Sequence, residues 1–184
     1  KTLETEVAER KSQLDRISDI QKEMKNIAKY YGQDVLRGIT NEDILKDMSN
    51  LRLEFGDRSV LRALHFINEN ERVGQEVEAI KTGDFEQFLQ LVKESGNSSY
   101  KYLQNVYTNI DINCQNVSIA LATSEVILGI NGVSRVHGGG FAGTIQAFVK
   151  NSHVAEYKKS MDMIFGEGSC CGLRIRKYGG MQVI

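Results

Sequence analysis

The absence of proline is the feature that most limits what this chain can fold into. None of its 184 residues is a proline, whereas average usage is about 5%. Proline ends or kinks helices because it lacks the amide hydrogen and its ring clashes with the preceding turn. A chain without it is free to form long helices, and this length predicts one domain or at most two small ones.

Charge and cysteine content exclude several classes of protein. The 24 acidic and 23 basic residues leave a formal net charge of -1. This charge gives no overall positive potential that would attract nucleic acid or an anionic membrane. No apolar run approaches the ~20 residues of a membrane span. The three cysteines, two of them adjacent, form no disulfide framework and fit a reducing compartment. We therefore expect a soluble cytoplasmic protein without nucleic-acid or membrane partners.

Residues 1–128 are predicted to be mainly helical. Apolar residues recur every three or four positions from Leu3 to Tyr31, which indicates an amphipathic helix ending near Gly32. A coiled coil would carry a similar stripe, but the flanking charges are irregular. Further helices are expected after a cap at Thr40 or Asn41 and over residues 59–81, 85–95 and 117–128. Between the helices over 59–81 and 85–95, Gly83 is expected to end the first in the left-handed conformation and Asp84 to cap the second.

The periodicity changes after residue 128, where most of the 17 glycines lie. Residues 133–136 and 144–149 are short and β-rich, residues 154–165 are helical, and residues 173–176 alternate apolar and basic. Residues 129–184 are thus predicted to be β-β-α-β with a glycine-rich loop. The whole chain, 1–184, is predicted to be a single α+β domain, with a helical layer packed on a small antiparallel sheet.

The glycine-rich loop is the strongest candidate for a ligand-binding segment. Three consecutive glycines remove side chains, so backbone amides can approach a ligand and form a concavity suited to phosphate. Arg135 would add positive charge and bidentate geometry, and Ser134 adjoins it. A hairpin turn without a ligand would show the same pattern. The loop residues are Gly138, Gly139, Gly140, Phe141, Ala142 and Gly143.

Residues 132–143 read Gly-Val-Ser-Arg-Val-His-Gly-Gly-Gly-Phe-Ala-Gly, which resembles the third, C-terminal motif of the galactokinases, members of the GHMP small-molecule kinase superfamily. That motif runs roughly G-A-R-M-T-G-G-G-F-G-G-C. Residues 62–73 are similar to the family's R-A-x-H-V-x-x-E-N-x-R-V helix, residues 83–85 with 94–95 to its next helix, and residues 109–111 to its P-E-L-D. The matching loop positions are Gly132, Arg135, Gly138, Gly139, Gly140, Phe141 and Gly143.

The resemblance implies a ferredoxin-like C-terminal domain of an enzyme that transfers a phosphoryl group from MgATP to the anomeric hydroxyl of galactose, giving galactose 1-phosphate. The loop would border the active site and brace the ATP phosphate loop of the N-terminal domain. That domain would be this chain's partner and would bind most of the ATP and Mg²⁺. Its sugar signature, ATP loop and catalytic aspartate do not appear here, and the chain begins with Lys1. We therefore expect a fragment without catalytic residues that is inactive alone.

Departures from the motif leave alternatives open. Ala142 replaces a glycine, Thr144 a cysteine, and Val136 with His137 a Met-Thr or Met-Ser pair. His137 would tune charge near neutral pH, although a solvated loop histidine is the simpler interpretation. A kinase for N-acetylgalactosamine or arabinose, a non-catalytic galactokinase-like sugar sensor, and a helical interaction module with a passive loop all remain.

Other polar residues are interpreted structurally. The carboxylates Glu69 and Glu71, with Arg72, lie in the predicted helix over 59–81 and are expected to form an interdomain or intrahelical ion pair rather than to act in acid/base catalysis. The histidines and cysteines show no metal-ligand spacing, so no metal site is predicted. Cys114 is expected to be a small buried residue. The tyrosines of residues 100–107 are expected to pack against the protein rather than stack on nucleic acid.

Overall fold

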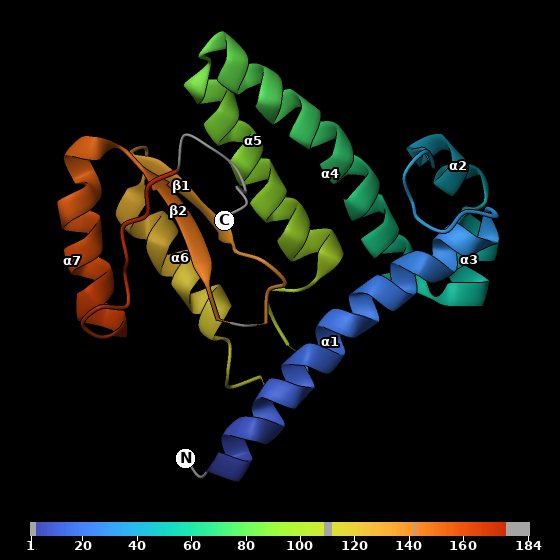
Figure 1. The fold of residues 1–184 in the computed structure, drawn as a ribbon, viewed down its shortest axis with the longest axis horizontal. Coiled ribbons are helices and arrows are strands. Elements are labelled where there is room, and N and C mark those ends of the chain that lie inside the picture. Colours follow the sequence, from blue (N-terminus) through green and yellow to red (C-terminus); the bar gives the residue numbers. More distant parts are fainter. Residues whose placement is uncertain (1–2, 109–111, 142, 176–184) are drawn as a thin grey trace, which may run out of the picture.

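The computed structural model describes residues 3–108, 112–141 and 143–175. Seven α-helices and two strands are seen in this part of the chain (Figure 1). Their bounds are α1 Leu3–Tyr30, α2 Asn41–Lys46, α3 Met48–Phe55, α4 Asp57–Thr82, α5 Phe85–Ser98, α6 Asn116–Leu128, β1 Gly132–Val136, β2 Ile145–Val149 and α7 Val154–Phe165. A π-helical segment, Ser99–Leu103, continues α5, and a 3-10 turn, Asn151–His153, precedes α7.

The α+β class and the helical layer on a small antiparallel sheet are confirmed. β1 and β2 pair antiparallel from Gly132 opposite Val149 to Val136 opposite Ile145. Helix α5 packs against β1, and α6 packs against both strands. Helices α4 and α5 form a hairpin that joins the sheet to the α1–α3 end of the molecule (Figure 1).

The buried apolar residues form separate cores. The first lies among α1 to α4 and includes Ile27, Ile44 and Leu51, whose exposure is 0%. The second lies between α6 and the sheet, around Leu121 and Val136. The third lies between α6, α7 and the sheet, around Leu128 and Met161. The hydroxyls of Ser124 and Tyr157, 2.8 Å apart and buried, also join α6 to α7. The long helices therefore connect two regions of burial rather than enclosing one.

Local signals fix several element ends as predicted. Thr40 is the N-cap of α2, and its hydroxyl accepts a bond from the Asp43 amide while the Asp43 carboxylate accepts from the Thr40 amide. Gly83 ends α4 in the left-handed conformation at a φ of 73°. The Asp84 carboxylate then caps α5 by accepting from the Gln87 amide at 3.0 Å.

Helix α5 does not stop before Gly96 as predicted, but continues to Ser98. A Cβ placed on Gly96 would lie 3.1 Å from the Cβ of Arg135 and 3.4 Å from the Ser134 carbonyl oxygen. The glycine therefore allows α5 to approach β1 closely. It serves packing rather than helix termination.

Two further predictions are wrong. In the strand expected over residues 173–176, Leu173, Arg174 and Ile175 belong to no strand and are exposed, while Arg176 lies outside the described residues. Alternation of apolar and basic residues does not by itself make a strand, because a strand also needs a neighbour to pair with. The described sheet consists of β1 and β2 and does not include these residues. Cys114 is exposed rather than buried, because it precedes the first turn of α6 instead of lying on an inward helix face.

No helix in the described ranges is long and apolar enough to cross a membrane.

Candidate functional site

The glycine-rich loop joins β1 to β2 as a hairpin with a fixed neck. The amide of His137 donates to the Thr144 carbonyl at 3.0 Å, directly after the last strand pair. Gly138, Gly140 and Gly143 have φ values of 64°, 74° and 82°. Residues with a Cβ rarely adopt this left-handed region. The backbone path therefore explains why glycine occupies these three positions.

One side of the loop rests on Asn105, which is 1% exposed. The amide of Phe141 donates to the Asn105 carbonyl at 3.0 Å. A Cβ placed on Gly140 would lie only 2.0 Å from that same oxygen. Gly140 is itself buried. The loop is thus seated on the backbone of residue 105 at a distance that only glycine permits.

Helix α1 supplies a second support. A Cβ placed on Gly139 would lie 3.0 Å from Cδ1 of Ile17, and the guanidinium carbon of Arg16 lies 5.5 Å from the centroid of the Phe141 ring. This is the geometry of a cation–π contact. We call Arg16, Ile17 and Asn105 the loop cradle. The cradle brings a positive charge close to the loop.

The other side of the loop is open. His137, Gly138, Gly139 and Gly143 are exposed, and a Cβ at Gly138 or Gly143 would meet no atom of the described residues within 4 Å. Ala142, which was also predicted to belong to the site, lies outside the described residues. Phe141 has a φ of 28°, an unusual value of the kind that concentrates at functional segments. The exposed backbone of the loop, held in place by the loop cradle, is suited to contact an anion. The loop glycines themselves offer no side chain for proton transfer.

The two flanking candidates, Ser134 and Arg135, lie beside a different space. They line a pocket of about 210 Å³ together with Asn97, Tyr100 and residues of α6. Among the described residues, the buried hydroxyl of Ser134 has no hydrogen-bond partner. Two polar contacts of Arg135 are described. Its Nε donates to the Val136 carbonyl at 3.2 Å, and its guanidinium forms an ion pair with Glu69 of α4.

Glu69 is the centre of an ion-pair network, which confirms the structural interpretation of this residue. Its carboxylate accepts from Arg72 on the same helix and from the Ser95 hydroxyl of α5. Its Oε1 lies 3.6 Å from Nη1 of Arg135 in β1. Two guanidinium groups thus balance one carboxylate where α4, α5 and β1 meet. This arrangement holds three elements together.

Two titratable groups border this network. Burial lowers the pKa of His65, whose Nδ1 lies 2.9 Å from the Ser98 hydroxyl, and the Glu69 carboxylate opposes that shift. Burial raises the pKa of Glu76, and the Glu69 carboxylate adds to that shift. Neither group has a described contact with the glycine loop. Across the described ranges, no three His, Cys, Asp or Glu side chains are grouped so that they would hold a metal ion.

The loop was predicted from sequence, but its cradle was not. Asn105 follows a π-helical segment and a left-handed Gln104, with φ of 56°, and neither feature has a periodic signal. Arg16 and Ile17 belong to the apolar stripe of α1 and its border, where nothing marks them as loop contacts.

Comparisons with known proteins agree on one family. The chain is 29% identical over 132 residues to the galactokinase of Actinobacillus pleuropneumoniae serotype 5b, an alignment that covers 72% of this chain and 32% of the relative. It is 32% identical over 158 residues to the galactokinase of Thermotoga petrophila, covering 79% of this chain and 40% of the relative. No family model matches the chain.

The fold agrees as well. The crystal structure of Lactococcus lactis galactokinase complexed with galactose aligns with a TM-score of 0.58 at 19% identity, covering 86% of this chain and 37% of that one. The chain therefore spans between 32% and 40% of the length of these curated relatives. Sequence and fold together identify the chain as a relative of the galactokinases.

Proposed function

We propose that this chain is the C-terminal domain of a galactokinase, which transfers a phosphoryl group from ATP to the anomeric hydroxyl of galactose. The observation that carries the proposal is the glycine loop, whose accessible backbone is seated on Asn105 and α1. Loop residues 138–143 border the active site and brace the phosphate loop of an N-terminal domain. The galactokinase relatives of the chain support this assignment.

The loop suits phosphoryl transfer because this reaction depends mainly on positioning and electrostatics. The exposed backbone at Gly138 and Gly139 offers close approach without side-chain bulk. Arg16, held against Phe141, adds positive charge at the same edge. Arg135 and Ser134 lie at the neighbouring pocket, and the ion pair of Arg135 with Glu69 ties the strand that leads into the loop to α4.

Mg²⁺ would neutralise charge on the ATP phosphates. A hard divalent cation takes oxygen ligands, usually carboxylates and phosphates. The described loop residues and the three residues of their cradle include no carboxylate, so these residues offer no ligand set of that kind. We assign ATP, Mg²⁺ and most sugar contacts to the N-terminal domain, and positioning to this chain.

The proposal is tested by an ADP-release assay of the full-length protein with galactose, N-acetylgalactosamine and arabinose, using the 184-residue chain as control. We expect galactose-dependent turnover by the full-length protein and none by the chain alone. Turnover with another sugar would retain the kinase and change its substrate. A folded full-length protein that binds sugar and ATP but releases no ADP with any of the three sugars would be a sensor.

The part played by the loop is tested by Gly139→Val in the full-length protein. The added side chain projects from the loop toward Ile17 and displaces the backbone. We expect kcat/KM to fall at least tenfold, which corresponds to about 1.4 kcal/mol of transition-state stabilisation. The matched control is Gly74→Val, at an exposed site on α4 where a Cβ meets no atom within 4 Å. Equal kinetics for the two variants would exclude a catalytic part for the loop.

A further inference from the structure

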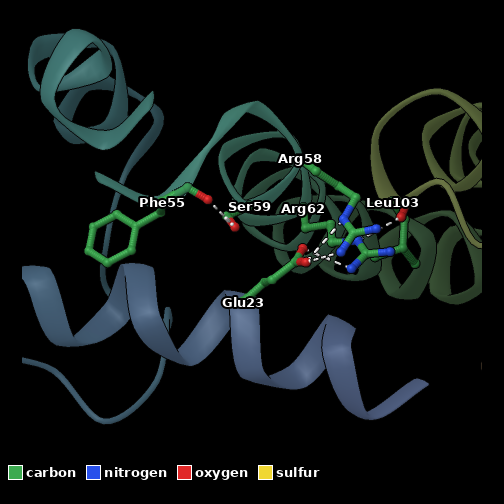
Figure 2. A network of polar contacts seen from close by, with 6 residues as sticks. All are labelled: Glu23, Phe55, Arg58, Ser59, Arg62 and Leu103. Atoms are coloured by element: carbon green, nitrogen blue, oxygen red, sulfur yellow. Dashed lines mark hydrogen bonds and ion pairs between the residues drawn. The ribbon is translucent and has the colours of Figure 1, made fainter. Parts of the chain in front are cut away.

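We propose that Arg62 is a positioning residue, which sets the glycine loop by holding both halves of the loop cradle at once. Its side chain is 3% exposed. Its Nη1 donates to Glu23 Oε2 of α1 at 2.8 Å, and its Nε donates to the Leu103 carbonyl at 3.1 Å (Figure 2). One planar guanidinium therefore bonds two segments that are far apart in sequence.

The first connection runs from Leu103 to the loop. Leu103 ends the π-helical segment, and the left-handed Gln104 turns the chain into Asn105. The Asn105 carbonyl accepts the Phe141 amide and leaves room only for glycine at position 140. A shift of the Leu103 carbonyl is therefore passed through two residues of backbone to the surface on which the loop rests.

The second connection runs from Glu23 along α1. Arg16 lies seven residues before Glu23, which is about two helical turns, so both face the same side of α1. Arg16 lies over the Phe141 ring, and the adjacent Ile17 faces Gly139. Fixing Glu23 against α4 therefore fixes the position at which α1 meets the loop.

Arg58 provides a comparison within the same cluster. It also binds the Glu23 carboxylate, through Nε at 3.0 Å and Nη2 at 2.5 Å (Figure 2). However, its side chain is 55% exposed, and its described bonds do not include the Leu103 carbonyl. Arg58 therefore ties α1 to α4 without reaching the Asn105 side of the cradle. Its loss should leave the loop in place, because Arg62 still binds Glu23.

The inference rests on the proposed function for its catalytic readout, and on the geometry alone for its structural one. In the full-length protein we would compare Arg62→Met, Arg62→Lys and Arg58→Met. Hydrogen exchange at residues 137–144 reports the loop, and the Phe141 amide reports its bond to Asn105 directly. Kinetics with galactose, with galactose KM and kcat measured separately and normalised to folded protein, report catalysis.

For Arg62→Met we expect about tenfold faster exchange of the Phe141 amide and at least tenfold lower kcat, with galactose KM within about twofold. A role limited to stability would lower the melting temperature while leaving kcat per folded molecule unchanged. Arg62→Lys keeps the charge, but its ammonium group cannot reproduce the planar guanidinium that bonds Glu23 and the Leu103 carbonyl at once. It should fold and show the same changes to a smaller extent, whereas Arg58→Met should match the unsubstituted protein.

The proposal is overturned if loop exchange in Arg62→Lys and Arg62→Met equals that in Arg58→Met. If Arg62→Met does not fold, Arg62→Lys decides the question by the same comparison. If the unsubstituted protein phosphorylates no sugar, the proposed function fails, but loop exchange still shows whether Arg62 holds the cradle. The two failures are therefore distinguishable.

Discussion

At the scale of single residues, the loop glycines have different reasons for being glycine. Gly138 has a φ of 64° but open space around it, whereas Gly140 combines a φ of 74° with a carbonyl oxygen 2.0 Å from its Cβ position. The first position is restricted by conformation alone. The second is restricted by conformation and by contact.

We therefore expect Gly138→Ala to lower the free energy of unfolding by about 1 kcal/mol, the cost of a left-handed alanine. Gly140→Ala should cost about 3 kcal/mol, since overpacking against Asn105 adds to that strain. Urea denaturation of both variants measures the difference. Equal losses would mean that the loop does not rest on Asn105.

His65 makes stability depend on pH. Its pKa in the folded protein is lowered from the ordinary 6.5, mainly by burial, with Arg72 and Arg135 lowering it further and Glu69 opposing them. As pH falls through 6.5, His65 of the unfolded chain therefore becomes protonated while His65 of the folded protein remains neutral. The stability associated with neutral His65 is complete above that pH and is lost as pH falls toward the folded pKa.

We expect His65→Gln to flatten the fall in unfolding free energy between pH 7 and pH 5, as measured by urea denaturation at each pH. Glu76→Gln is the control. The pKa of Glu76 is raised from 4.5, so its stabilising contribution is lost in the opposite direction, as pH rises from 4.5. A slope unchanged by His65→Gln would contradict the burial of a neutral imidazole.

At the scale of the elements, two helical glycines show what a sequence pattern does and does not indicate. Gly74 falls inside the helix predicted over residues 59–81, whereas Gly96 follows the predicted end of the next helix. Both lie inside helices. An added Cβ would meet nothing at Gly74, but would lie 3.1 Å from the Arg135 Cβ at Gly96.

Gly74→Ala should raise the unfolding free energy by about 0.5–1 kcal/mol, because alanine restricts the unfolded chain and favours helix. Gly96→Ala should not show this gain, because α5 must move away from β1 to admit the methyl group. Thermal and urea unfolding of the two variants give the comparison. A similar gain at both positions would refute close α5–β1 packing.

The same contrast explains which features of this protein could be predicted from its sequence and which could not. Helices α1, α4 and α6, both strands and the caps at Thr40 and Asp84 follow from periodicity and from side chains acting within a few residues. The extension of α5 depends on a distant strand. The seating of Gly140 on Asn105 depends on segments that only the folded chain brings together. Local patterns therefore predicted the loop but not the surface beneath it.

At the scale of the whole molecule, the separate cores predict separate local stabilities. Leu51 lies in the core among α1 to α4, and Met161 in the core between α6, α7 and the sheet. Truncating either to alanine should cost about 2–5 kcal/mol through lost burial and the cavity left behind. Because the buried residues of these two cores form separate clusters, we expect each substitution to destabilise mainly the elements around its own core.

Native-state hydrogen exchange tests this expectation. Leu51→Ala should accelerate exchange in α1–α4 more than in α6 and α7, and Met161→Ala should do the reverse. A uniform acceleration in both variants would mean that the molecule opens as one cooperative unit.

The position of α1 also has a consequence for how the protein is made. This helix is synthesised before the loop that its Ile17 and Arg16 support, and more than 100 residues separate the two in sequence. While the chain emerges from the ribosome, α1 must remain available until the hairpin arrives to complete the contact. Separating α1 from the rest of this chain, by proteolysis or by design, would therefore remove a support that the loop requires once it has been synthesised.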